Sequence, residues 1–161
     1  MMGCEMNRKE YNKSLVERFP FLLPRRYRTD EVPENYDYSY TELDEMPEGW
    51  RIAFGEQMCQ EIADCLRKDD TMDEYRILQI KEKFGFLHWY CSQTTREVYD
   101  IISKYSNMSK RICLCCGKPA TRITTSWISP YCDDCIPTYG ADKKQRHTIS
   151  IEEFFAEIGD D

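Results

Sequence analysis

Cys113-Leu-Cys-Cys116-Gly117 and Cys132-Asp-Asp-Cys135, two cysteine pairs near the C-terminus, decide the fold of the last third of this chain. Fifteen residues separate the pairs, which is within the range of four-cysteine zinc sites. Zn²⁺ takes four soft ligands in a tetrahedron, and a C-x-x-C turn presents two thiolates to one ion. Gly117 follows the first pair, where a tight turn often needs a residue that tolerates positive φ. The spacing predicts one structural Zn²⁺ with no open coordination position, and its ligands are Cys113, Cys116, Cys132 and Cys135.

Two other interpretations of these cysteines stay open. A redox C-x-x-C motif uses one pair, usually in a βαβ setting, whereas this chain has two pairs and no such setting. An iron–sulfur cluster also takes four thiolates, and the spacing excludes it only weakly. No signal peptide or long apolar run precedes the nine cysteines, so metal-bound thiols in a reducing compartment are favoured over disulfides, with no membrane association expected.

The length of 161 residues indicates one domain with an appendage, or two small domains. We expect an α+β domain over residues 1–108, a zinc module over 109–147 and a short amphipathic tail helix over 148–161. About 40 residues cannot bury enough surface to fold alone. Structural zinc contributes on the order of 10 kcal/mol in small fingers, so the metal is expected to hold the module together.

Apolar periodicity predicts three helices in the first domain. The first runs over residues 8–19, and the last follows a capping box formed by Thr94 and Glu97 and ends before Ser109. The strongest begins at Pro47-Glu-Gly-Trp50 and ends near Lys68. Its apolar residues recur every four positions: Trp50, Phe54, Met58, Ile62 and Leu66.

Two β-rich runs between residues 75 and 91 flank Phe84-Gly85 and predict a hairpin, with Leu78 and Ile80 on one face. Residues 121–131 should cross between the two cysteine turns as β-like chain, with Trp127 over the metal site or docking it onto the rest. Ser150 opens a tail helix that is marginal alone and should dock on this protein. The predicted fold class is α+β: helices packed on a small antiparallel hairpin or sheet, with a zinc-ribbon or treble-clef-like module.

Charge is distributed unevenly over a chain of net charge −7. Residues 29–50 hold eight acids and no Lys or Arg, and three alternating tyrosines within them suggest a short extended piece in an acidic loop. Residues 109–147 hold seven bases against three acids, a net of +4. Four of these bases flank a metal cluster of formal charge −2, where they would offset its charge: Lys110, Arg111, Lys118 and Arg122.

The sequence resembles a recurrent group of small uncharacterised zinc-binding proteins carried by phages and other bacterial mobile elements. The resemblance covers roughly residues 49–136 and includes Gly49-Trp50, Gln79-Ile-Lys-Glu-Lys-Phe-Gly85, Leu87-His-Trp-Tyr90, Cys113-x-x-Cys116-Gly-x-Pro-Ala and Trp127…Cys132-x-x-Cys135. Many members have Arg before Phe-Tyr where this chain has His88-Trp89-Tyr90, and many have His in place of Cys135. The resemblance implies a zinc-stabilised fold in the cytoplasm of a bacterial host and supplies no assigned activity.

No catalytic motif stands out, so we expect a binding protein rather than an enzyme. The only histidines are His88, in a predicted strand, and His147, in a basic linker. The leading hypothesis is an inhibitor of a host defence nuclease, of the anti-CRISPR or anti-restriction type, whose carboxylates and tyrosines imitate nucleic acid on a basic groove. Its candidate contact residues are Asp30, Glu31, Glu34, Tyr36, Asp37, Tyr38, Tyr40, Glu42, Asp44 and Glu45.

The alternative is a nucleic-acid-binding zinc module in a phage regulator. It rests on the basic stretch 109–147 together with aromatic rings on which bases can stack. The overall acidity of the chain counts against it. Its candidate contact residues are Lys110, Arg111, Lys118, Arg122, Trp127, Lys143, Lys144 and Arg146.

Overall fold

The computed structural model of this chain describes residues 7–136, 138–139, 144–145 and 148–158. The helical elements in chain order are α1 (Arg8–Arg18), η2 (Pro20–Leu22), η3 (Glu42–Glu45), α2 (Glu48–Trp50), the π-helical turn η4 (Arg51–Gly55), α3 (Glu56–Lys68), α4 (Arg96–Ser109) and α5 (Ile151–Ile158). The strands are β1 (Ile77–Lys83), β2 (Phe86–Cys91), β3 (Arg122–Thr124), β4 (Ser129–Tyr131), β5 (Thr138–Tyr139), β6 (Lys144–Gln145) and β7 (Thr148–Ser150).

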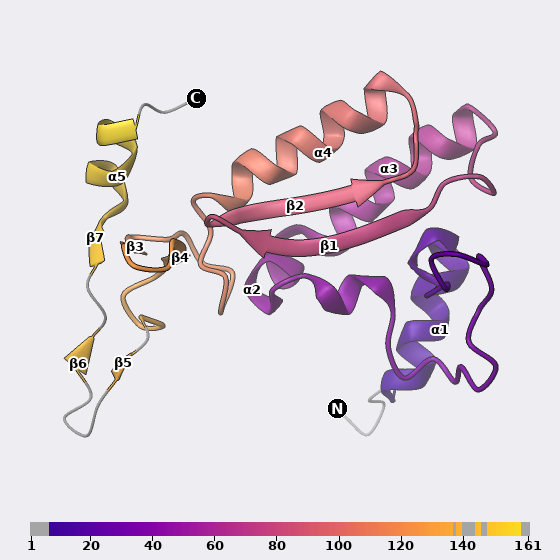
Figure 1. Ribbon diagram of the computed structural model, residues 1–161, viewed down its shortest axis with the longest axis horizontal. Helices are drawn as coiled ribbons and strands as arrows, with labels where there is room; N and C mark the ends of the chain where they lie inside the picture. The colour runs from indigo at the N-terminus through magenta and orange to yellow at the C-terminus, as the bar shows by residue number, and fades with distance from the viewer. Residues whose placement is uncertain (1–6, 137, 140–143, 146–147, 159–161) are drawn as a thin grey trace.

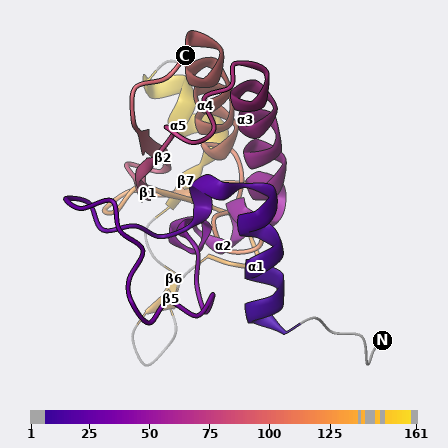
Figure 2. The ribbon, with the colours of Figure 1, turned by 90° about the vertical axis from the view of Figure 1, so that its right-hand side faces the viewer.

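The main layer is an antiparallel hairpin of β1 and β2 with α3 and α4 on one of its faces (Figures 1 and 2). A second antiparallel sheet, in the order β4-β3-β7, lies at the C-terminal side of the molecule with α5 beside it (Figure 1). The predicted α+β class, with helices packed on a small antiparallel sheet, is confirmed.

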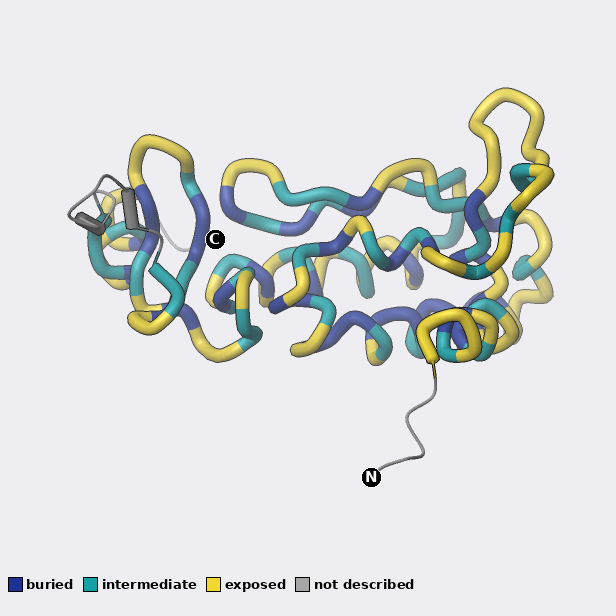
Figure 3. The backbone as a smooth tube through the Cα atoms, turned by 90° about the horizontal axis from the view of Figure 1, so that it is seen from below, coloured by how far each residue is buried: buried dark blue, intermediate teal, exposed yellow. Residues whose placement is uncertain are grey.

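The predicted apolar ladder of the strongest helix is confirmed, because all five of its residues are buried. The helix begins at Glu48, widens to a π-turn over Arg51–Gly55 and ends at Lys68, where Asp70 adopts a positive φ of 55°. Figure 3 shows that buried residues recur along the helices and the β1–β2 hairpin, whereas many of the connecting turns are exposed. The main core therefore lies between the helices and the hairpin.

The start of α4 differs from its predicted start. Thr95, not Thr94, is the N-cap, and its hydroxyl accepts a hydrogen bond from Val98 N at 3.4 Å. Glu97 does not close a capping box with Thr94, since its carboxylate accepts a hydrogen bond from Lys68 Nζ at 2.6 Å. The local sequence pattern assigned the Glu97 side chain to a helix cap, but it forms a contact between α3 and α4 instead.

The predicted shared face of Leu78 and Ile80 is wrong. Ile80 is 2% exposed, whereas Leu78 is 51% exposed. The pairing of β1 with β2 shifts register between Ile77 and Gln79, and such an irregularity changes which side chains face the core. The hairpin itself is confirmed, with Phe84 and Gly85 in its turn at positive φ.

A second, smaller core forms between the C-terminal sheet and α5. Its buried residues are Ala120, Ile123, Ile151 and Phe155, and Ile128 and Phe154 pack against them. The predicted cap at Ser150 is present, since its hydroxyl accepts a hydrogen bond from Glu153 N at 3.1 Å. The tail helix therefore docks on this chain, as expected.

Candidate metal centre

The first cysteine pair lies in a tight turn closed by backbone hydrogen bonds. Gly117 N donates to Cys113 O at 3.0 Å, and Cys113 N donates to Lys118 O at 2.8 Å. Gly117 has a φ of +86°, a conformation that glycine adopts without steric cost. The turn brings Cys113 and Cys116 together as a pair of candidate ligands.

The second pair follows β4 in a turn of its own, where Cys135 N donates to Cys132 O at 3.2 Å. The sulfur atoms of all four predicted ligands lie within 4.8 Å of one another, and those of Cys116 and Cys132 are 3.6 Å apart. Four sulfurs at 2.3 Å from a tetrahedral Zn²⁺ stand about 3.8 Å apart, close to the observed separation. All four are free thiols, and the cluster can hold a metal ion.

The electrostatics of the cluster favour a bound cation. Burial raises the pKa of Cys113, but hydrogen bonds from the backbone N–H groups of Cys132, Cys116 and Cys115 outweigh it and give a pKa of about 7. Burial, followed by hydrogen bonds with the neighbouring cysteine side chains, raises the pKa of Cys135. A metal dication at the centre would stabilise the thiolate forms and allow all four sulfurs to bind it.

The first cysteine turn packs directly on the start of α2. A Cβ atom added at Gly49 would lie 2.2 Å from Cys113 O and 2.7 Å from Gly117 N. Gly49 N also donates a hydrogen bond to Leu114 O at 2.9 Å. Two glycine backbones therefore meet where a side chain on either would prevent the contact, and this contact fixes the metal centre to the long helix.

Further contacts hold the same joint. The indole Nε1 of Trp50 donates to Ile112 O at 2.9 Å. The hairpin turn adds a second contact, since a Cβ at Gly85 would lie 2.9 Å from Ile128 Cγ2. Within the metal-bearing part, Leu114 N donates to Pro130 O at 3.1 Å and ties the first cysteine turn to β4. The role of the paired glycines was not predicted, although Gly49 and Gly117 each flank a predicted element.

The other described cysteines are not among the four grouped sulfurs. Cys59 and Cys65 are buried, Cys91 is half-buried and Cys115 is exposed. Cys4 lies outside the described residues. Cys115 thus stands between two ligands in sequence and contributes no sulfur to the group of four.

The acidic segment is folded against bases from elsewhere in the chain. The Asp30 carboxylate accepts from Arg76 Nε at 2.7 Å and Nη2 at 3.0 Å, and these hydrogen bonds hold its pKa below the ordinary value. Asp37 forms an ion pair with Lys9 at 2.9 Å, and the hydrogen bond from Lys9 lowers its pKa to about 2. Both aspartates, which are candidate contact residues for a partner, are thus paired with bases of this chain.

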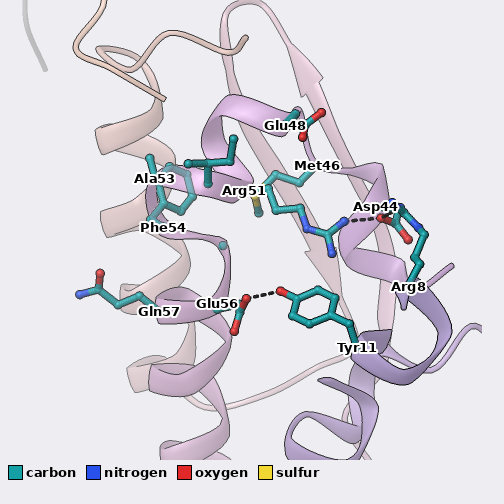
Figure 4. Close-up of a pocket in the computed structure, with 12 residues that line it drawn as sticks. Arg8, Tyr11, Asp44, Met46, Glu48, Arg51, Ala53, Phe54, Glu56 and Gln57 are labelled. Carbon is teal, nitrogen blue, oxygen red and sulfur yellow. Dashed lines mark hydrogen bonds and ion pairs between the residues drawn. The ribbon is translucent and has the colours of Figure 1, made fainter. Parts of the chain in front are cut away.

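Asp44 is engaged in the same way. Its carboxylate accepts from Arg8 Nη2 at 2.7 Å, from Arg51 Nη1 and from Thr41 N at 2.8 Å. Asp44 and the two arginines line a pocket of about 510 Å³ between α1 and the π-turn, where Tyr11 donates to Glu56 (Figure 4). No pattern in the sequence predicts this pocket, because the residues that line it come from separate elements. Most of its charged side chains form ion pairs or hydrogen bonds with one another.

The remaining carboxylates of the segment differ in exposure. Burial, and then the charge of Glu45, raises the pKa of half-buried Glu42 to about 7. Four others are exposed and form no ion pair with any residue that the structure describes: Glu31, Glu34, Glu45 and Glu48. We name these four side chains the acidic surface.

The three tyrosines of the segment do not form the predicted extended piece. Tyr38 has a φ of +63°, and the Tyr36 ring lies 5.0 Å from that of Tyr38 and 5.4 Å from that of Tyr40, centroid to centroid. The Tyr36 hydroxyl donates to Tyr40 O, and burial raises the pKa of Tyr36 to about 12. Tyr40 remains 44% exposed.

Two of the bases that were candidates for nucleic-acid contact cover aromatic rings of this chain. Lys110 Nζ lies 5.3 Å from the ring centroid of Phe86. Arg111 Cζ lies 4.1 Å from the ring centroid of Phe155 in α5. Both side chains therefore help to join the metal-bearing part to neighbouring elements.

The other candidates of this set are divided. Arg122 donates to Thr148 O at 3.0 Å across β3 and β7, whereas Lys118 is exposed. Trp127 is 66% exposed, so the prediction that it docks the metal module onto the rest is wrong. Neither Lys143 nor Arg146 is among the described residues, and the side chain of Lys144 is not described.

Among the residues that the structure describes, no helix is both long and apolar enough to cross a membrane. Comparison with known proteins found no matching family model, no matching curated protein and no matching solved structure.

Proposed function

We propose that the protein is a zinc-stabilised binding protein in which Zn²⁺ has a structural role. The observation that carries this proposal is the convergence of four cysteine sulfurs from two turns, the first of which is packed on α2. Four protein ligands complete a tetrahedron and leave no position for a substrate, as in structural zinc sites. The ion therefore fixes the C-terminal sheet and α5 to the helical core.

The geometry of the sulfurs supports a single ion. A multi-iron cluster binds its cysteines through different iron atoms and needs the sulfurs farther apart than one ion does. Sulfur atoms that all lie within 4.8 Å of one another suit one tetrahedral ion. Elemental analysis of the purified protein should return one zinc per chain, and a preparation without zinc would overturn the assignment.

We further propose that this binding protein, of phage or mobile-element origin, inhibits a nucleic-acid-binding host defence protein in the bacterial cytoplasm. Support comes from the sequence resemblance and from the charge of the acidic surface in a chain of net charge −7. Carboxylates that have no ion-pair partner of their own attract a basic groove and speed encounter with it. Tyr40, 44% exposed beside these carboxylates in sequence, offers an aromatic contact.

Neutralising the acidic surface should abolish the inhibition. The test variant carries Gln at the four positions of the acidic surface, and the control carries Gln at four exposed acids elsewhere: Glu17, Glu74, Glu152 and Glu157. Both lose four negative charges. In nuclease assays with restriction and CRISPR effectors, the test variant should inhibit at least tenfold less than the control, because it loses the charges that face the groove.

Equal inhibition by the two variants would remove the acidic surface as the contact site. Failure of the unmodified protein to inhibit any effector would instead remove the inhibitor proposal, while leaving the structural zinc site in place.

A second candidate function, nucleic-acid binding by the metal module, is favoured by the exposure of Trp127 between β3 and β4. An exposed indole provides a face on which a base can stack. Trp127→Ala together with Lys118→Gln should then weaken binding of a labelled oligonucleotide about tenfold. Unchanged binding by this variant at low salt would exclude the module as the contact surface.

A further inference from the structure

The β1–β2 hairpin has one face in the core and one face outside it. Ile80, Leu87 and Trp89 point into the core and are at most 5% exposed. The alternate positions are half-buried or exposed, and α3 and α4 lie on the opposite side of the hairpin (Figure 2). We name these positions the outer face: Gln79, Lys81, Lys83, Phe86, His88 and Tyr90.

Three rings of the outer face form a column along β2. The ring centroids of Phe86 and His88 are 4.3 Å apart with 31° between their planes, and those of His88 and Tyr90 are 5.9 Å apart with 28° between them. The Tyr90 hydroxyl and His88 Nδ1 are 3.3 Å apart, which fixes the two rings relative to each other. The column is thus ordered before any partner binds.

An ammonium group lies near each end of this column. Lys110 Nζ is 5.3 Å from the centroid of Phe86, and Lys81 Nζ is 5.8 Å from the centroid of Tyr90. A third, Lys83, lies 5.1 Å from the ring centroid of Phe84, which is 66% exposed in the hairpin turn. Rings and cations therefore alternate over the outer face.

The outer face carries no carboxylate, although the chain as a whole is acidic. The one acid of the hairpin, Glu82, pairs in register with the buried Leu87 and accepts a hydrogen bond from Gly85 N at 2.9 Å. The acidic turn η3 (Glu42–Glu45) contacts β1 and limits the basic surface on that side. A concentrated patch of positive charge remains on a chain that would otherwise repel polyanions.

We propose that the outer face binds single-stranded nucleic acid. A nucleobase stacks on an aromatic ring more strongly than an exposed ammonium group binds the same ring face. A base can therefore replace Lys81 over Tyr90 or Lys110 over Phe86. Each displaced ammonium group then reaches a neighbouring phosphate. Binding of one nucleotide thus provides both a stacked base and an ion pair.

The chemistry of the face favours a single strand over the other anionic partners. Duplex bases are stacked on one another and cannot lie on a protein ring, whereas unpaired bases can. An acidic peptide satisfies the lysines but leaves the ring column without a flat partner. The outer face shares no residue with the acidic surface, and its proposed role does not rest on the proposed inhibitor function.

The first test measures charge. A fluorescein-labelled dT12 oligonucleotide is titrated with the zinc-loaded full chain, and fluorescence anisotropy is followed at several salt concentrations. Three phosphate contacts give a slope of about −2 for log K against log salt, and Lys81→Gln with Lys110→Gln should bring it to about −0.7. Lys13→Gln with Arg96→Gln, at two exposed bases outside the face, should leave the slope unchanged.

The second test measures stacking. Tyr90→Leu should weaken dT12 binding about tenfold, whereas Tyr90→Phe, which keeps the ring, should bind within about twofold of the unmodified chain. Circular dichroism reports whether each variant is folded. If Tyr90→Leu does not fold, the lysine pair still decides the outcome.

Four outcomes would overturn the proposal. They are no binding of dT12 at low salt, equal affinity for duplex DNA, equal affinity for polyglutamate, and a loss of binding in the Lys13 and Arg96 control as large as in the Lys81 and Lys110 variant. Equal affinity for polyglutamate would identify an acidic protein as the partner, and the control result would show that the outer face is not the contact surface.

Discussion

Replacing one metal ligand should unfold the C-terminal part of the protein while the helical core stays folded. In Cys135→Ser the cluster retains three thiolates, and a hydroxyl is a much weaker ligand for zinc. Structural zinc contributes on the order of 10 kcal/mol to small metal-bound folds, so most of the stability of this part is expected to disappear. Chelation of the metal from the unmodified chain should have the same effect.

The reason is the small size of the second core. Among the residues whose side chains the structure describes, it has four buried hydrophobic ones, Ala120, Ile123, Ile151 and Phe155, against twenty in the main cluster. Such a core cannot offset the conformational entropy of ordering the strands and α5 around it. The main core includes α3, α4 and the hairpin and does not depend on the metal for its apolar contacts.

Hydrogen exchange separates these two parts. Amide protection in β3, β4, β7 and α5 should disappear in Cys135→Ser, whereas protection in α3 should persist. Cys115→Ser is the matched control, because Cys115 is exposed and its sulfur is not part of the cluster. It should change stability by no more than about 0.5 kcal/mol. Retained protection in β3 after removal of the metal would show that the metal does not hold the module together.

Features set by neighbours along the chain could be predicted from the sequence. The four-residue apolar repeat from Trp50 to Leu66 needs only helical geometry to form a buried face, and all five residues are buried. The two C-x-x-C turns are local as well, and their spacing predicted the group of four sulfurs that the structure brings together.

Features set by distant partners could not be predicted. Asp30 and Asp37 belong to an acidic run, yet they pair with Arg76 and Lys9, which no local pattern links to them. The alternating pattern of the strand predicts Leu78 on the same face as Ile80, but the register shift between Ile77 and Gln79 leaves Leu78 exposed. The same limit applies to Arg111, which the sequence predicts to offset the charge of the metal cluster, whereas its guanidinium lies over the Phe155 ring of α5.

The contact between Gly49 and Gly117 is the least predictable feature of the site, and it should be the most sensitive to substitution outside the cysteines. An added Cβ at Gly49 would lie 2.2 Å from Cys113 O and 2.6 Å from Leu114 C. Both are backbone atoms of the metal-binding turn, so no side-chain rotation can relieve the clash. Either α2 or the cysteine turn must move.

Gly49→Ala should therefore destabilise the protein by about 3 kcal/mol or more, and it should also weaken zinc binding because the turn that holds Cys113 is displaced. Gly55→Ala, in the same helix, is the matched control. Its Cβ would meet first the flexible side chain of Arg51, at 3.3 Å. The better helix propensity of alanine opposes that crowding, so stability should stay within about 1 kcal/mol of the unmodified chain.

Urea unfolding and competition with a chromogenic zinc chelator measure the two effects. The expected pattern is a large loss of stability and of zinc affinity in Gly49→Ala and little change in Gly55→Ala. Similar stabilities for the two variants would show that the start of α2 does not fix the metal-binding turn. A loss of stability with zinc affinity unchanged would place the strain in the helix alone, because the cysteine turn would then keep its geometry whatever happens to its neighbour.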